Sequence, residues 1–241
     1  MNQAMLSAVS GAQAALRRLD TITANLANST TTGFKSLLHL QQGRRASEFG
    51  AAMPSLTGDS VKTDFSQGRL ETTGDPFHLA LAGEGFFVVA TPQGERLTRR
   101  GAFELDAEGQ LVTGEGYRVQ GDGGDIGLAD AIAIGGQVSV GPDGTIQVGE
   151  DELGRVRVAT VADLDALQRE PGGLFRAAGA LQDAEASTYD VHQGRLEAAN
   201  FSAVENLALL IETMRAFEAY MTSLGKIDGV RQQAIREVAR A

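Results

Sequence analysis

The sequence predicts an α+β protein in which both chain ends form one helical domain and the middle forms a second domain of antiparallel β-strands. Near each end, apolar residues recur every three or four positions, which is the period of an amphipathic helix. The middle carries short apolar runs separated by turn sequences, a pattern typical of strands. Most of the 30 glycines also lie in the middle, as expected where the chain reverses often.

We expect the helical domain, a discontinuous coiled coil, to comprise residues 1–35 together with 200–241. The central all-β domain is expected over residues 72–199. Residues 36–71 show no regular period and contain proline and glycine residues that interrupt helices and strands. A structureless connector of this length is unusual inside a compact domain, so we expect it to be extended and to join the two domains.

The first helix is expected over residues 1–28. Its apolar residues step by three or four positions and form a narrow seam, as in a coiled coil. The seam residues are Met5, Val9, Ala12, Leu16, Leu19, Ile22 and Leu26. Many of their neighbours are small, and Gly11 costs up to about 1 kcal/mol relative to alanine inside a helix. We therefore expect this helix to be marginal in isolation and to become ordered on assembly.

The second helix is expected over residues 203–240, with a similar seam. Neither helix can bury its seam alone, so the other chain end is the expected partner, followed by further copies of the protein. Two ordinary helices packed on the central domain are the alternative. The residues predicted to form the assembly interface are Met5, Val9, Leu16, Leu19, Leu26, Leu207, Ile211, Met214, Met221 and Leu224.

The stretch 24–36 is predicted to end the first helix. Asn25 and Asn28 lie one turn apart, where they can bond to a neighbouring helix or turn. Gly33 can adopt the left-handed conformation that stops a helix, and Phe34 is expected to anchor the exit. An ordinary helix end with polar side chains is the simpler alternative.

The central domain is predicted to contain three hairpins followed by a long strand. Strands at short spacing with turns between them favour an antiparallel sandwich or an irregular barrel over a βαβ arrangement. The hairpins are expected at 86–91 with 96–100, at 102–106 with 110–113, and at 137–140 with 145–148, and the long strand at 155–162.

Composition excludes several classes of function. The net charge is −10, and residues 71–195 alone carry −12, so the ends carry about +2. An acidic middle argues against nucleic acid as a partner. The chain has no cysteine, which excludes disulfides and thiolate chemistry. No apolar run is long enough to span a bilayer, so no membrane insertion is expected, and the first residues do not resemble a cleaved signal peptide.

No catalytic residue, cofactor or metal site is predicted, so the protein is not expected to be an enzyme. The sequence Gly83-Glu84-Gly85 lacks the third glycine and the following helix of a phosphate-binding loop. The three histidines, at positions 39, 78 and 192, are scattered and have no metal-binding spacing.

Three segments resemble a known family. Residues 24–36 (ANLANSTTTGFKS) are similar to the N-terminal signature of bacterial flagellar rod, hook and hook-associated proteins. Residues 79–121 resemble the central signature that rod and hook members share. Residues 193–228 resemble the C-terminal signature, with Ala199 where these proteins commonly have serine. The segments occur in the family's order and, with their spacing, cover most of the chain.

The resemblance implies a structural subunit of the flagellar basal-body rod. The terminal helices would pair as an inner coiled coil, and many subunits would form a tube that transmits torque to the hook. The implied partners are copies of itself, sibling rod proteins, indirectly the hook, and the flagellar type III export apparatus. The implied location is the periplasmic rod, reached without a cleaved signal peptide.

Two alternatives are open. The short connector and single β domain are most similar to the proximal-rod member of the family, and the distal-rod member is the alternative within it. A carbohydrate- or cell-wall-binding β domain with helical tethers is an alternative of a different class. Glycosidases need two carboxylates positioned in a cleft. The middle has many carboxylates but few aromatic residues to form a sugar platform.

Overall fold

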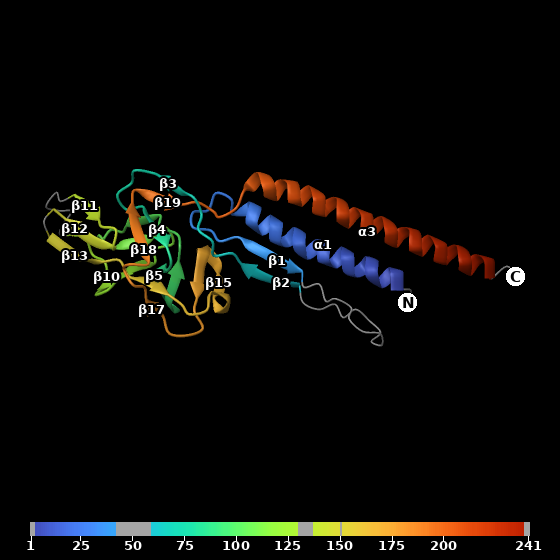
Figure 1. Cartoon of the computed structure of the whole chain (residues 1–241), viewed down its shortest axis with the longest axis horizontal. Coiled ribbons are helices and arrows are strands. Elements are labelled where there is room, and N and C mark those ends of the chain that lie inside the picture. The colour runs from blue at the N-terminus through green and yellow to red at the C-terminus, as the bar shows by residue number, and fades with distance from the viewer. Residues whose placement is uncertain (1–2, 42–58, 130–136, 150, 239–241) are drawn as a thin grey trace. The chain divides into compact units, whose positions relative to one another are not determined.

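The computed structural model of the chain describes residues 3–41, 59–129, 137–149 and 151–238 (Figure 1). In this part of the chain the α-helices are α1 (Gln3–Ala27) and α3 (Ala203–Val238), and two short 3-10 helices span Leu164–Ala166 and Pro171–Gly173. The first strands are β1 (Leu37–Gln41), β2 (Asp59–Thr63), β3 (Leu70–Thr72), β4 (Leu79–Gly83), β5 (Phe86–Thr91), β6 (Gly94–Thr98), β7 (Phe103–Leu105), β8 (Leu111–Thr113), β9 (Arg118–Gly121) and β10 (Gly124–Asp125). The remaining strands are β11 (Val138–Val140), β12 (Thr145–Val148), β13 (Asp151–Arg155), β14 (Val158–Thr160), β15 (Gln168–Glu170), β16 (Leu174–Arg176), β17 (Gln182–Asp183), β18 (Tyr189–Gln193) and β19 (Arg195–Glu197).

The chain divides into two compact units, and the expected α+β class with a central antiparallel β domain is confirmed. The helical unit comprises Met1–Ser29, Leu37–Thr63 and Ser202–Ala241. The β unit comprises Thr30–Ser36 and Asp64–Phe201. These bounds differ from the expected ones, because residues 30–36 belong to the β unit and the chain therefore passes between the units four times.

The extended connector expected at 36–71 is replaced, where the structure describes it, by a paired hairpin. β1 pairs antiparallel with β2, with Leu38 opposite Lys62 and Leu40 opposite Ser60. β1 also packs against α1 within the helical unit. Residues 42–58, which include most of the helix-breaking residues of the expected connector, lie outside the described residues.

The two terminal helices lie side by side in the helical unit and run in opposite directions (Figure 1). This arrangement confirms that each chain end is the other's partner. Helix α1 begins and ends close to its expected bounds, and so does α3.

The β unit is built around β5, the first strand of the first predicted hairpin. Every strand pairing in the described residues is antiparallel, and β5 lies between β6 and β9 in a ten-stranded sheet. Phe87 and Val89 belong to the larger apolar cluster, whereas Phe86 and Val88 belong to the smaller one. Because alternate side chains of a strand point to opposite faces, this strand is buried on both faces.

The three predicted hairpins are confirmed as β5–β6, β7–β8 and β11–β12. The prediction of one long strand at 155–162 was wrong. Arg155 ends β13, and β14 begins only at Val158. Between them the backbone changes partners, because the Val156 N–H bonds the Gly144 carbonyl and the Arg157 N–H bonds the Gln120 carbonyl.

Candidate functional site: the helix pair and the junction of the chain ends

The buried face of α1 consists mainly of small side chains. Ala8, Ala12 and Ala15 are buried, and Ile22 follows two turns later on the same face. Alanine side chains let two helix backbones approach closely. The small residues of the first helix thus form its contact with α3.

Gly11 on this helix has a specific packing role. A Cβ atom at Gly11 would lie 2.5 Å from Cε1 of the Tyr220 ring on α3, far closer than atoms can approach. The ring therefore fills the space that the missing side chain leaves. This contact explains why a residue with low helix propensity stands inside α1.

Helix α3 carries two apolar rows that point in different directions. One row faces α1 and includes the buried Thr213 and the half-buried Phe217 and Leu224. The second row, which we call the α3 stripe, consists of Leu207, Ile211, Met214 and Met221. These side chains are 46%, 53%, 48% and 49% exposed. Ile211 and Met214 are close to Thr213 in sequence but lie about 100–160° away from it around the helix. One apolar row of α3 is therefore covered by α1, and the other is exposed.

The ten predicted interface residues separate into two groups in the structure. Leu16 and the α3 stripe are exposed. The others are half-buried within the helical unit, and they are Met5, Val9, Leu19, Leu26 and Leu224. The pattern of residues did not distinguish the two groups, because both repeat at nearly the same spacing along the chain.

Asn25 holds the start of the hairpin against α1. Its side-chain Nδ2 donates to the Leu37 carbonyl at 2.9 Å, and its Oδ1 accepts from the Leu37 N–H at 2.8 Å. Both backbone groups of an edge strand's first residue are thereby satisfied. Asn28 instead donates to the Ala24 carbonyl of its own helix at 2.8 Å.

Gly33 and Phe34 belong to the β unit. Helix α1 already ends at Ala27, so Gly33 does not cap it as expected, although Gly33 does take the left-handed conformation, with φ +65°. The Gly33 N–H donates to the Glu197 carbonyl at 2.6 Å. Phe34 is buried in edge-to-face contact with Phe201, and the Arg169 guanidinium lies 4.6 Å from its ring centre.

Next to this turn, a buried ionic cluster joins the two ends of the β unit's sequence. Lys35 Nζ and Glu197 Oε1 are 2.7 Å apart, and each side chain is 1% exposed. The Arg99 guanidinium lies 3.6 Å from Glu197 Oε2. Glu197 Oε1 also accepts from the Gly68 N–H at 2.7 Å, and Lys35 donates to the Ser66 carbonyl at 2.8 Å. Four separate chain segments therefore meet at one carboxylate.

Burial is the main cause of the pKa shifts of the two cations in this cluster. It lowers the pKa of Lys35 and of Arg99 below their ordinary values, while the Glu197 carboxylate opposes that shift in both groups. An ammonium group without Glu197 would be a buried charge without a counter-charge, which is strongly destabilising. The carboxylate is thus the group on which the burial of both cations depends.

Asn200 bonds the backbone of two other segments of the β unit, near the points where the chain passes between the units. Its Oδ1 accepts from the Ser36 N–H at 2.7 Å, and its Nδ2 donates to the Asp64 carbonyl at 2.8 Å. Its own N–H donates to the Phe34 carbonyl. Residues 36 and 64 each lie directly at a passage between the β unit and the helical unit, so this one amide side chain fixes the backbone at two of the four passages.

Sequence reasoning missed Lys35, Arg99, Glu197 and Asn200 as site residues. All four lie inside the three segments that resemble the family signatures, but no local pattern pairs a lysine with a glutamate 162 positions away.

Gly68 lies beside the same cluster, at a position where the backbone passes very close to another segment. A Cβ there would lie 2.0 Å from the Ala198 carbonyl oxygen, so glycine permits the close passage of the backbone beside the cluster.

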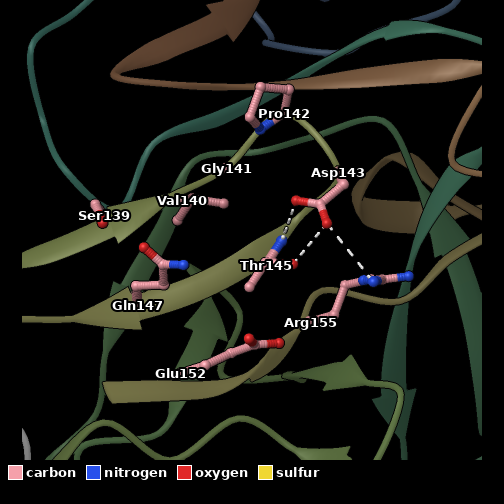
Figure 2. Close-up of a pocket in the computed structure, with 9 residues that line it drawn as sticks. All are labelled: Ser139, Val140, Gly141, Pro142, Asp143, Thr145, Gln147, Glu152 and Arg155. Atoms are coloured by element: carbon pink, nitrogen blue, oxygen red, sulfur yellow. Dashed lines mark hydrogen bonds and ion pairs between the residues drawn. The ribbon is translucent and has the colours of Figure 1, made fainter. Parts of the chain in front are cut away.

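A polar hollow of about 510 Å³ lies over β11, β12 and β13 (Figure 2). Asp143 stands on one side, where Thr145 Oγ1 donates to it at 2.7 Å, and Arg155 Nη2 lies 3.6 Å from the same carboxylate (Figure 2). None of the nine residues that line the hollow is aromatic, so it has no stacking platform for a sugar. The polar side chains around the hollow are therefore best explained by the hydrogen bonds of the Asp143 turn.

The Asp143 turn should make the β unit more sensitive to acid. Hydrogen bonds from Thr145 hold the pKa of Asp143 below its ordinary value of 3.8. Its stabilising contribution is therefore complete above pH 3.8 and is lost as the pH falls through the lower pKa of the folded state. We expect Asp143→Asn to lose less stability than the wild type as the pH falls from about pH 4 to about pH 2 in urea unfolding. Equal losses in the two proteins would contradict this.

Within the described residues, no group of three or more His, Cys, Asp or Glu side chains is arranged to hold a metal ion. In the same part of the chain, neither helix combines the length and the apolar character needed to cross a bilayer.

Three protein-family models match the chain. Residues 5–35 match the family described as flagella basal body rod protein. Residues 80–148 match the flagellar hook protein FlgE/F/G D1 domain, and residues 192–237 match the flagellar basal body rod FlgEFG protein C-terminal region. The two terminal matches contain the buried ion pair of Lys35 and Glu197.

Curated relatives agree over the whole length. The chain is 31% identical over 245 residues to the flagellar basal-body rod protein FlgF of Caulobacter vibrioides, covering 100% of this chain and 99% of the relative. It is 29% identical over 264 residues to FlgG of Bacillus subtilis (98% of each chain) and 28% identical over 246 residues to FlgF of Escherichia coli (95% of each). The chain therefore belongs to the family of flagellar basal-body rod proteins.

Proposed function

We propose that this protein is a structural subunit of the flagellar basal-body rod that assembles through its helical unit. The single observation that carries the proposal is the open seam of α3. One face of the helix already packs on α1, yet the α3 stripe leaves four large apolar side chains about half exposed. A helix with two apolar seams needs two neighbours, which is the situation of a helix inside a multi-helix assembly.

The stripe is large enough to contribute to assembly. Full burial of one large apolar side chain is worth roughly 1.5–3 kcal/mol, and about half of each stripe side chain is still to be buried. Four such residues therefore supply several kcal/mol per subunit, before the loss of translational and rotational freedom is subtracted. Weak contacts of this size, repeated through an assembly, suit a shaft made of many subunits.

The partners follow from the family. We propose that the subunit packs, as a coiled coil of its terminal helices, with copies of itself and with sibling rod proteins, and connects through them to the hook. It would reach the periplasmic rod through the flagellar type III export apparatus without a cleaved signal peptide. The resemblance to FlgF supports a place in the proximal rod; a FlgG-like place in the distal rod is the alternative. A mechanical role of this kind requires no catalysis.

The β unit has a surface that suits the outside of such an assembly. Its sequence between residues 71 and 195 carries a net charge of −12. Like charges on neighbouring copies repel, so association is directed to the nearly neutral helical unit.

The test is a double substitution in the stripe, Leu207→Asp with Ile211→Asp. Both side chains are exposed, so we expect the full chain to fold and to keep the circular dichroism and urea midpoint of the wild type. The two carboxylates added to each stripe would oppose its burial. Incorporation into isolated basal bodies and swimming motility should therefore be lost.

The matched control is Ala208→Asp with Ala219→Asp, which adds the same charge to exposed positions of α3 outside the stripe. This variant should incorporate and support motility. Normal motility of the stripe variant, or equal loss in both variants, would contradict assembly through the stripe.

A further inference from the structure

The β1–β2 hairpin exposes apolar side chains. Leu38 is 46% exposed and Leu40 is 38% exposed. Because alternate residues of a strand point to the same face, these two leucines share one face of the hairpin. Their cross-strand partners Lys62 and Ser60 lie on that face too. We call these four residues the hairpin face.

The contact of β1 with α1 leaves the hairpin face uncovered. A two-stranded sheet needs another element to pack against in water, and α1 supplies one for the rest of the hairpin. Asn25 holds its first residue to α1, but the leucines of the hairpin face remain half exposed. The α3 stripe belongs to the same helical unit and is exposed as well, so the two surfaces do not cover each other within one copy.

We propose that the hairpin face is a second assembly surface and that its occupant is the α3 stripe of another copy of this chain. The inference rests on the proposed function and adds which surface meets which. It joins two different surfaces of the subunit rather than one surface to itself.

The spacing of the two surfaces fits. Leu38 and Leu40 are roughly 6.6 Å apart along a strand, and Leu207 and Ile211 are about 6 Å apart along a helix. Two leucines of the strand can therefore pack between successive turns of the stripe.

The charges also fit. Glu218 is exposed and lies in line with the stripe, one turn after Met214 and one turn before Met221. Among the described residues, no cation forms an ion pair with it. The hairpin face brings Lys62 beside Leu38, so apolar groups meet apolar groups while an ammonium meets a carboxylate.

Packing two stripes against each other is the main competing arrangement. The stripe contains no cation, so that arrangement would bring Glu218 against a surface that offers it no ammonium, whereas the hairpin face offers Lys62. A contact between unlike surfaces also leaves one hairpin face and one stripe open at the ends of every oligomer. Such head-to-tail contacts generate open helical assemblies when the rotation does not close, as a shaft requires.

Cross-linking in assembled particles tests the pairing, because the chain has no cysteine of its own. Two differently tagged variants, Leu38→Cys and Ile211→Cys, are expressed together, and isolated basal bodies are treated with a bismaleimide. We expect a mixed dimer carrying both tags. The pair Leu40→Cys with Met214→Cys repeats the test with neighbouring positions. The control pair replaces Leu38→Cys by Leu153→Cys, an exposed apolar position of β13 in the β unit.

A mixed dimer several-fold more abundant than in the control pair supports the inference. Particles that contain both variants of each test pair but give no mixed dimer, or only dimers of one variant with itself, overturn it while the proposed function stands. Absence of the wild-type chain from isolated basal bodies would instead contradict the proposed function itself.

Discussion

Replacement of Glu197 by glutamine is expected to lower the free energy of unfolding by about 3–5 kcal/mol. The substitution keeps the size of the side chain but leaves the Lys35 ammonium and the Arg99 guanidinium buried without their shared counter-charge. Removal of one partner of a buried ion pair is costly because the other charge stays out of water. Urea unfolding followed by circular dichroism measures the change.

The control for this substitution is Glu71→Gln. Glu71 lies on β3 and pairs with Arg69 at 2.7 Å, but both side chains are largely exposed. Exposed ion pairs contribute at most about 1 kcal/mol, so the urea midpoint should move little. Equal shifts for Glu197→Gln and Glu71→Gln would show that the buried cluster has no special role.

A second arm separates the charge from the packing. Glu197→Leu combined with Lys35→Met removes the pair and fills its space with apolar groups, a change that is often neutral or stabilising at buried pairs. The double variant should be more stable than Glu197→Leu alone, with a remaining deficit from Arg99. If the double variant is no more stable, the loss comes from packing or from the Gly68 hydrogen bond rather than from the unpaired lysine.

Gly33→Ala is expected to lower the free energy of unfolding by about 2–5 kcal/mol, from backbone strain and overpacking together. Gly33 has φ +65°, a conformation that alanine rarely adopts. Its new Cβ would also lie 2.5 Å from the backbone carbon and oxygen of Arg99. Backbone atoms cannot rotate away as a side chain does, so the turn and the cluster beside it must shift.

Gly74→Ala is the matched control, because Gly74 has a similar φ of +79° and no heavy atom within 4 Å of the added Cβ. It should cost only the strain of the left-handed conformation, about 1–2 kcal/mol. The difference between the two variants isolates the collision with Arg99. Equal urea midpoints for the two variants would rule out the collision as the cause.

The elements of this fold were largely predictable from local pattern. Apolar spacing placed both helices, and Asp143-Gly144 placed the β11–β12 turn, because these signals depend on neighbouring residues alone. The break between Arg155 and Val158 was not predictable. The segment keeps an alternating pattern, and only its change of hydrogen-bond partners interrupts the strand.

The candidate site was predictable in part. The seam residues were identified. The side of each helix that faces the other was not, because it depends on the buried alanines of α1 and on the Tyr220 ring that fills the space at Gly11. The spacing of apolar residues does not encode either contact. The pairing of Lys35 with Glu197 depends on the chain passing beside β19, where the Gly33 N–H bonds the Glu197 carbonyl. Contacts between residues so far apart in sequence follow from tertiary structure, so residue type alone does not reveal them.

The Tyr220 ring in the gap at Gly11 has a consequence for any sliding of α1 along α3. Alanine side chains are small and alike, so a row of them alone would do little to prevent two packed helices from sliding along each other. A slip of one turn, about 5.4 Å, would bring the ring onto Ser7 or Ala15, each of which carries the Cβ that Gly11 lacks. The aromatic ring thus fixes the axial register of α1 against α3 and opposes sliding of one helix along the other.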